Sequence, residues 1–170
     1  MPTWGCRPGL MPDVERVVPP VAELAESPVW DPATSSLLWV DIPAGTVYRY
    51  RPESGNETVL VAGEPVGAVG VRVGGGLVLA VGLGVELVDP DGSRRALAKV
   101  EAGDRMNDAK CDPFGRFVAG TLRADETPGG AGLYAIESDG TVRLLRSDVT
   151  LSNGLGWTAD GRTMFHIDTT

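Results

Sequence analysis

Polar side chains recur at one position of the chain, each four residues before an anchor residue that opens a turn. The three pairs are Glu26 before Trp30, Asn107 before Cys111, and Asn153 before Trp157. Carboxylate and amide oxygens are the ligands that hard divalent cations prefer. If the three segments are copies of one structural unit, their polar side chains converge on a common axis. The spacing therefore suggests a site for a divalent cation.

Each of these residues also has a simpler interpretation. Glu26 taken alone would be a solvated loop carboxylate. Asn153-Gly154 taken alone would be a tight turn, because Asn and Gly tolerate turn conformations. The register that they share with Asn107 is the reason for favouring ligand roles for Glu26 and Asn153.

The ligands need a repeated unit to position them, and the sequence contains one. A weaker copy has Val71 as its anchor, so the anchors at 30, 71, 111 and 157 are 41, 40 and 46 residues apart. Units of this length with several short strands are typical of propeller blades. The residue four before Val71 is Gly67, so this unit offers no ligand.

The composition predicts an all-β fold. The chain has 23 Gly and 13 Pro to punctuate short apolar runs, and Asp91-Gly92 and Asp139-Gly140 are typical hairpin turns. Gly74-Gly75-Gly76 joins two apolar runs without a following helix, so we interpret it as a turn and not a phosphate loop. With blades of ~42 residues, the chain holds about three and a half blades.

We expect two parts in the chain. Residues 1–20, rich in Pro, are predicted to be a flexible N-terminal lead, with a first strand beginning near Val17 or Val21. Residues 21–170 are predicted to form a partial β-propeller domain whose later blades are absent, since propellers close with 4 to 8 blades.

Charge and hydropathy exclude several classes of function. A net charge of −8 disfavours nucleic-acid binding, which needs clustered Lys and Arg. No run of 18 apolar residues predicts a membrane span, and no signal peptide is evident, so a cytoplasmic location is expected. Of the two cysteines, Cys6 lies in the lead and Cys111 is predicted to be a buried small hydrophobe, with no disulfide between them. The sequence carries no signal for an oligomeric state.

Four sequence blocks together resemble the senescence marker protein 30, gluconolactonase and regucalcin family. They are Glu26-Ser27-Pro28-Val29-Trp30-Asp31, Arg105-Met106-Asn107-Asp108-Ala109-Lys110-Cys111-Asp112, Phe117-Val118-Ala119-Gly120-Thr121 and Leu151-Ser152-Asn153-Gly154-Leu155-Gly156-Trp157. The resemblance runs from about Ala22 to the last residue. It implies a six-bladed propeller that opens sugar lactones with one divalent cation, Ca²⁺ foremost, with Zn²⁺, Mn²⁺ or Mg²⁺ as alternatives.

The resemblance also implies roles for individual residues. Glu26 and Asn153 match metal ligands of the family, while Arg105, Asn107 and Asp125 match residues that contact the substrate. The family's third ligand, an Asp that is also the proposed catalytic base, belongs to a later blade, so no catalytic residue is assigned here. This chain alone is expected to be inactive.

The residues themselves support these roles and leave alternatives open. Arg105 offers a fixed positive fork and Asn107 both a donor and an acceptor, which suits a polyhydroxylated sugar lactone. Arg105 could instead form a surface ion pair with Asp104 or Asp108, and Asp125 could be an ordinary loop carboxylate. His166, the only histidine, is expected to be a packed residue and not a base.

Two functions from different classes fit this pattern. One is a metal-dependent lactonase, in which the cation polarises the lactone carbonyl for attack by water. The other is a non-enzymatic calcium-binding or interaction propeller, in which the same oxygens hold an ion for stability or signalling. A sugar lactone is the expected partner of the first, and neither function involves nucleic acid or a membrane.

Overall fold

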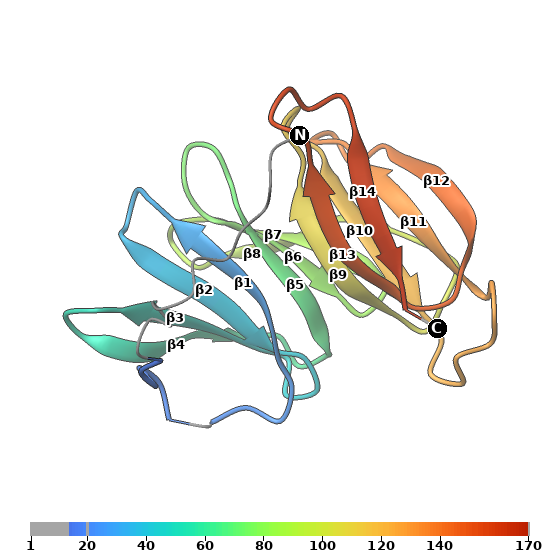
Figure 1. Ribbon diagram of the computed structural model, residues 1–170. Helices are drawn as coiled ribbons and strands as arrows, with labels where there is room; N and C mark the ends of the chain where they lie inside the picture. The colour runs from blue at the N-terminus through green and yellow to red at the C-terminus, as the bar shows by residue number, and fades with distance from the viewer. Residues whose placement is uncertain (1–13, 20, 170) are drawn as a thin grey trace, which may run out of the picture.

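The protein is built from antiparallel β-sheets that follow one another around an arc (Figure 1). The computed structural model describes residues 14–19 and 21–169. Of the predicted lead, residues 1–13 and 20 lie outside this part. The first strand begins at Ala25, so the prediction of a strand near Val17 or Val21 is wrong, because the chain gains a pairing partner in β2 only from Ala25 onward.

Three sheets have four strands each and the last has two. Their strands follow the chain order, and the bounds are β1 Ala25–Asp31, β2 Ser36–Asp41, β3 Thr46–Arg51, β4 Gly55–Val61, β5 Val66–Val71, β6 Leu77–Val81, β7 Gly84–Val88, β8 Arg94–Lys99, β9 Arg105–Cys111, β10 Phe117–Leu122, β11 Ala131–Ile136, β12 Val142–Val149, β13 Ser152–Trp157 and β14 Met164–Asp168. Three sheets and the first half of a fourth confirm the prediction of three and a half blades.

Turn chemistry explains why the strands end where they do. Gly92 and Gly140 have φ values of 86° and 89°, a region that L-residues with a side chain rarely adopt, and they close the β7–β8 and β11–β12 hairpins. Gly74, Gly75 and Gly76 form the turn between β5 and β6, closed by a hydrogen bond from Arg72 N to Gly76 O. Both predicted hairpins and the glycine turn are therefore confirmed.

The cores lie between neighbouring sheets. Because side chains alternate across a strand, each middle sheet contributes residues to two cores. On β5 and β6, Val69 and Leu79 pack toward the first sheet, whereas Ala68 and Val78 pack toward the third. A third core, around Leu155, joins the third sheet to β13 and β14. This face-to-face stacking of twisted sheets fixes the first strand of each sheet along the inside of the arc.

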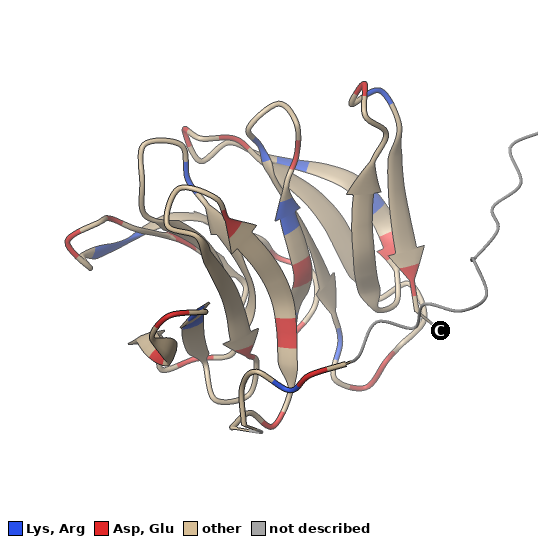
Figure 2. Ribbon diagram, turned by 60° about the vertical axis from the view of Figure 1, so that its left-hand side comes forward, with Lys and Arg blue, Asp and Glu red and all other residues tan. Residues whose placement is uncertain are grey.

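The first strands of successive sheets touch one another. Strands β1, β5, β9 and β13 are in contact in that order, and they carry the four repeat positions predicted from the sequence. Charged residues lie mostly in loops and at strand ends, with a few acidic and basic residues within strands (Figure 2). In the described part of the chain, no helix is long and apolar enough to cross a membrane.

Candidate functional site

The four repeat positions coincide with an irregularity in the inner strand of each sheet. The pairing register of the first two strands shifts between Glu26 and Val29, between Val66 and Ala68, and between Asn153 and Leu155. In the third sheet the shift falls between Met106 and Ala109, which brackets Asn107. Such β-bulges bend a strand and re-aim a side chain. The repeated bulge therefore explains how an edge of polar side chains is produced in an otherwise apolar stack.

Hydrogen bonds and close contacts bring the four positions to one level of the arc. Ser27, next to Glu26, accepts a hydrogen bond through Oγ from Val69 N at 3.0 Å, two residues beyond Gly67. A Cβ on Gly67 would lie 2.4 Å from Asn107 O. Asn107 Nδ2 in turn donates to Ser152 O at 2.8 Å, directly before Asn153. The four repeat positions are thus linked by a chain of contacts between successive blades.

The contact at Gly67 gives a reason for the missing ligand in the second blade. Its α-carbon faces the carbonyl oxygens of Met106 and Asn107, which would be 2.5 and 2.4 Å from an added Cβ. Real Cβ atoms do not approach backbone this closely. Glycine is required there because the backbone of β9 occupies the space that a side chain would need.

The side chains of Arg105 and Asn107 are joined directly by a hydrogen bond. Arg105 Nη1 donates to Asn107 Oδ1 at 2.9 Å and to Met106 O at 3.0 Å. Burial lowers the pKa of the half-buried Arg105 guanidinium, but an arginine stays protonated at neutral pH. Among the described residues, Arg105 forms no ion pair with Asp104 or Asp108, so the alternative of a surface ion pair is not what the structure shows.

Asn107 is fixed at both ends of its amide. Its oxygen accepts from Arg105 and one of its N–H groups donates to Ser152 O, which leaves one N–H group and one oxygen lone pair for a ligand. Because Arg105 has five donors and uses only Nη1 in these contacts, most of its donors also remain for a ligand.

Glu26 and Asn153, the two predicted metal ligands, lie on β1 and β13, with β5 and β9 between them. Glu26 is exposed, and no ion pair of its carboxylate occurs in the described part of the chain. Asn153 Nδ2 donates to Thr169 Oγ1 at 3.5 Å, so its amide oxygen stays available. Residues 14–19 and 21–169 contain no group of three or more His, Cys, Asp or Glu that could hold a metal ion.

Asp125 lies in a loop beside the start of β9, and its carboxylate contacts Arg123. Its loop is tied to the start of β9 because Ala124 N donates to Asp104 Oδ2 at 2.8 Å. The exposed Asp125 carboxylate accepts two hydrogen bonds from Arg123, each at 3.0 Å, and these lower its pKa. Asp125 is therefore held in a local ion pair with Arg123, in a loop that is tied to the start of β9.

Asp108 is a residue of the site that the sequence analysis did not assign. Burial raises the pKa of Asp108, while the charge of Lys110, the backbone N–H groups of Ala109 and Gly154, and the charge of His166 partly oppose this shift. The sequence signal was its place directly after Asn107, inside the segment where the pairing register shifts.

Other predictions for individual residues have mixed outcomes. His166 is half-buried and its Nε2 lies 2.9 Å from Ser152 Oγ, which agrees with a packed residue; burial lowers its pKa. The prediction that Cys111 is buried is wrong. Cys111 is exposed because it ends β9 beside a small cavity of about 200 Å³. Cys6 lies outside the described residues.

The raised pKa of Asp108 makes a prediction about stability. A carboxyl whose pKa is raised on folding binds more protons in the native state, so its contribution to stability falls as pH rises through that pKa. Asp108→Asn keeps the shape of the side chain and removes its half-buried charge. We expect Tm, measured in EDTA, to rise by a few degrees at pH 7, and the gain to vanish below about pH 4, where an ordinary Asp is protonated.

Asp139→Asn provides the control of opposite sign. Asp139 accepts from Thr141 N at 2.8 Å, and its pKa is lowered by that hydrogen bond. Its replacement should lower Tm or leave it unchanged at pH 7. A Tm of Asp108→Asn that does not exceed the wild-type value at pH 7 would contradict the assignment of an unfavourable buried charge.

The sheets and the bulged inner strands define the class of protein. Four-stranded antiparallel sheets that stack around an axis through their first strands are those of a β-propeller. A solved calcium-binding regucalcin from Agrobacterium tumefaciens superposes with a TM-score of 0.80 at 25% sequence identity, over 87% of this chain and 51% of that one.

The chain belongs to the family described as SMP-30/Gluconolactonase/LRE-like region, which matches residues 24–170. It is 35% identical to the 6-deoxy-6-sulfogluconolactonase of Pseudomonas putida, over 86% of this chain and 52% of that protein. It is 36% identical to the pentonolactonase XacC of Haloferax volcanii, over 92% of this chain and 53% of that protein. The chain thus spans about half the length of the curated relatives it matches, and the resemblance drawn from the four sequence blocks is confirmed.

Proposed function

We propose that this chain forms the substrate-orienting part of a sugar lactonase and supplies two ligands of its cation-binding site. The observation that carries the proposal is the Arg105–Asn107 pair, held to Ser152 O beside Asn153. Two relatives with about 35% identity are named as sugar lactonases, which supports lactones as the substrate class.

The site residues fit a divalent cation as partial ligands. Glu26 offers an exposed carboxylate and Asn153 a free amide oxygen, both of which Ca²⁺, Mn²⁺ and Mg²⁺ accept. These two donors are fewer than the 6–8 oxygens of a typical Ca²⁺ site, so further ligands must come from other residues, water or substrate. A cation there would polarise a lactone carbonyl and lower the pKa of a bound water.

The chain's own residues would bind and orient the sugar. The remaining donors of Arg105 suit the ring and carbonyl oxygens of a lactone, and the free N–H of Asn107 suits a hydroxyl. Because the Asn107 amide is clamped by Arg105 and Ser152 O, it needs no reorganisation when a ligand arrives. No catalytic base is assigned to this chain, and the 170-residue chain alone is expected to hydrolyse lactones no faster than buffer.

The test uses a chimera in which residues 1–169 are followed by the second half of the Pseudomonas putida lactonase. We expect the chimera to hydrolyse D-glucono-1,5-lactone or a pentonolactone in the presence of Ca²⁺ or Mn²⁺. Arg105→Met should reduce kcat/KM by about 100-fold, as loss of a charged substrate contact does. Arg95→Met, an exposed position on β8, should leave kcat/KM unchanged.

A full rate in Arg105→Met would contradict the substrate role of Arg105. The second candidate function, a cation-binding propeller without catalysis, is favoured by the likeness to a calcium-binding regucalcin. It would be supported if the chimera bound Ca²⁺ through Glu26 and Asn153 and hydrolysed none of the lactones.

A further inference from the structure

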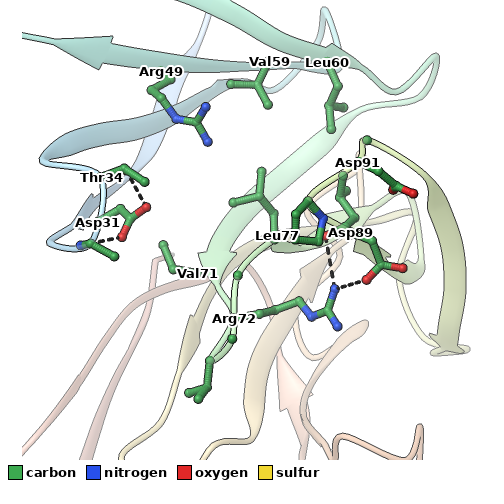
Figure 3. Close-up of a pocket in the computed structure, with 18 of the residues that line it drawn as sticks. Asp31, Thr34, Arg49, Val59, Leu60, Val71, Arg72, Leu77, Asp89 and Asp91 are labelled. Carbon is green, nitrogen blue, oxygen red and sulfur yellow. Dashed lines mark hydrogen bonds and ion pairs between the residues drawn. The ribbon is translucent and has the colours of Figure 1, made fainter.

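A separate cavity lies between the first two sheets, at the far end of the inner strands from the candidate site (Figure 3). Its volume is about 850 Å³. It is lined by Asp31 at the end of β1 and Val71 at the end of β5, whereas Glu26 and Gly67 lie near the starts of these strands. Five residues of strand place Asp31 ~16 Å from Glu26. Each of the two sheets that line the cavity has four strands.

The wall of the cavity is mainly apolar. Val59, Leu60 and Leu77 contribute side chains to it, as Figure 3 shows. Two guanidinium groups also line the cavity. That of Arg72 is satisfied, because Nη1 donates to Asp89 Oδ1 at 2.7 Å and to Val88 O at 3.1 Å.

Arg49 is the second guanidinium that lines the cavity, and it shares its ion-pair partner with another arginine. In the described part of the chain, its one ion pair is with Glu57, at 3.6 Å between Nη1 and Oε1. The same carboxylate oxygen is held more closely by Arg51, so a single carboxylate serves two arginines. Arg49 Nε is buried and has no hydrogen-bond partner among the described residues. A buried donor without a partner is energetically unfavourable.

The acidic groups around the cavity do not neutralise Arg49. Asp31 accepts from Ala33 N at 3.0 Å and from Thr34 Oγ1 at 2.6 Å, Asp89 is paired with Arg72, and Asp91 accepts from Ser93 N at 2.9 Å. These three carboxylates would repel a dianion such as phosphate more strongly than a monoanion. A ligand with a single negative charge close to Arg49 and an apolar body along the wall therefore fits this lining better than a dianion.

We propose that this cavity binds a small monocarboxylate with an aliphatic or aromatic body. The carboxylate would pair with the terminal nitrogens of Arg49, where charge-assisted hydrogen bonds form in a partly desolvated place. The body would cover Val59, Leu60 and Leu77. This site is independent of the proposed lactonase site and does not rest on it.

The test uses hexanoate as the probe and the full 170-residue chain, with binding measured by calorimetry and by NMR. We expect a Kd on the order of 1 mM for a ligand of this size. Arg49→Gln should weaken binding at least tenfold. Arg95→Gln is the control: it removes an exposed guanidinium from β8 that does not line the cavity and leaves the Glu57 pairing unchanged, so Kd should stay within twofold.

Two further measurements decide the outcome. Neutral 1-hexanol should bind wild type at least tenfold more weakly than hexanoate, and in the wild-type protein hexanoate should shift the amide signals of Leu60, Val71 and Leu77. Equal binding of hexanol, equal binding by Arg49→Gln, or shifts confined to other regions would each overturn the proposal. The changes in the amide signals of the wild-type protein test the proposed carboxylate site even if a variant does not fold.

Discussion

Asn153→Ala in the chimera is expected to reduce cation affinity and lactone turnover together, each by more than about 100-fold. Loss of a side chain that contacts only a metal ligand typically lowers metal affinity or activity by about 10–100-fold. Loss of a direct ligand should lower them more. Asn153 Oδ1 is free to bind because only Nδ2 is used, by Thr169. The measurements are Mn²⁺ binding by electron paramagnetic resonance and kcat/KM at a fixed, limiting cation concentration.

Asn153→Asp is the matched variant, because it keeps an oxygen of the same reach. It should retain cation binding within about tenfold. Excess cation should restore part of the turnover of Asn153→Ala, since weakened affinity is overcome by mass action. A chimera that hydrolyses lactone at the wild-type rate after Asn153→Ala, or in metal-depleted buffer, would contradict the proposed cation role.

The architecture could be predicted because it depends on local signals. Asp91-Gly92 and Asp139-Gly140 specify hairpins through backbone conformation alone, and the spacing of anchors reports how many strands separate equivalent points. Both are properties of short segments, so a single sequence contains them. The fold class and the number of blades follow from these signals.

The details of the site depend on contacts between blades, which a linear sequence does not reveal. Asp108 lies in the bulged part of β9, and the groups of another strand that influence its pKa, Gly154 and His166, are not evident from a simple alternation of side chains. The ion pair of Asp125 with Arg123 is likewise set by the shape of its loop. Cys111 was predicted to be buried by analogy with Trp anchors, yet its position ends a strand beside a cavity.

The same dependence on neighbouring blades underlies the repeat position that has no ligand. Gly67 could be recognised from the sequence as a gap, but its cause is the backbone of Met106 and Asn107. A residue with a side chain at position 67 would have to displace the strand that carries Asn107. Packing between β5 and β9 and the geometry of the candidate site are therefore coupled through this glycine.

Gly67→Ala is accordingly expected to destabilise the 170-residue chain by about 3 kcal/mol or more, the upper end of the range for overpacked sites. This corresponds to a fall in Tm of roughly 6–12 °C, measured by circular dichroism. Gly156→Ala is the control on another inner strand: an added Cβ there meets nothing within 4 Å, so Tm should change by less than about 2 °C. Similar Tm values for the two variants would show that β5 and β9 can separate at this point, and the clamp on Asn107 would then not depend on Gly67.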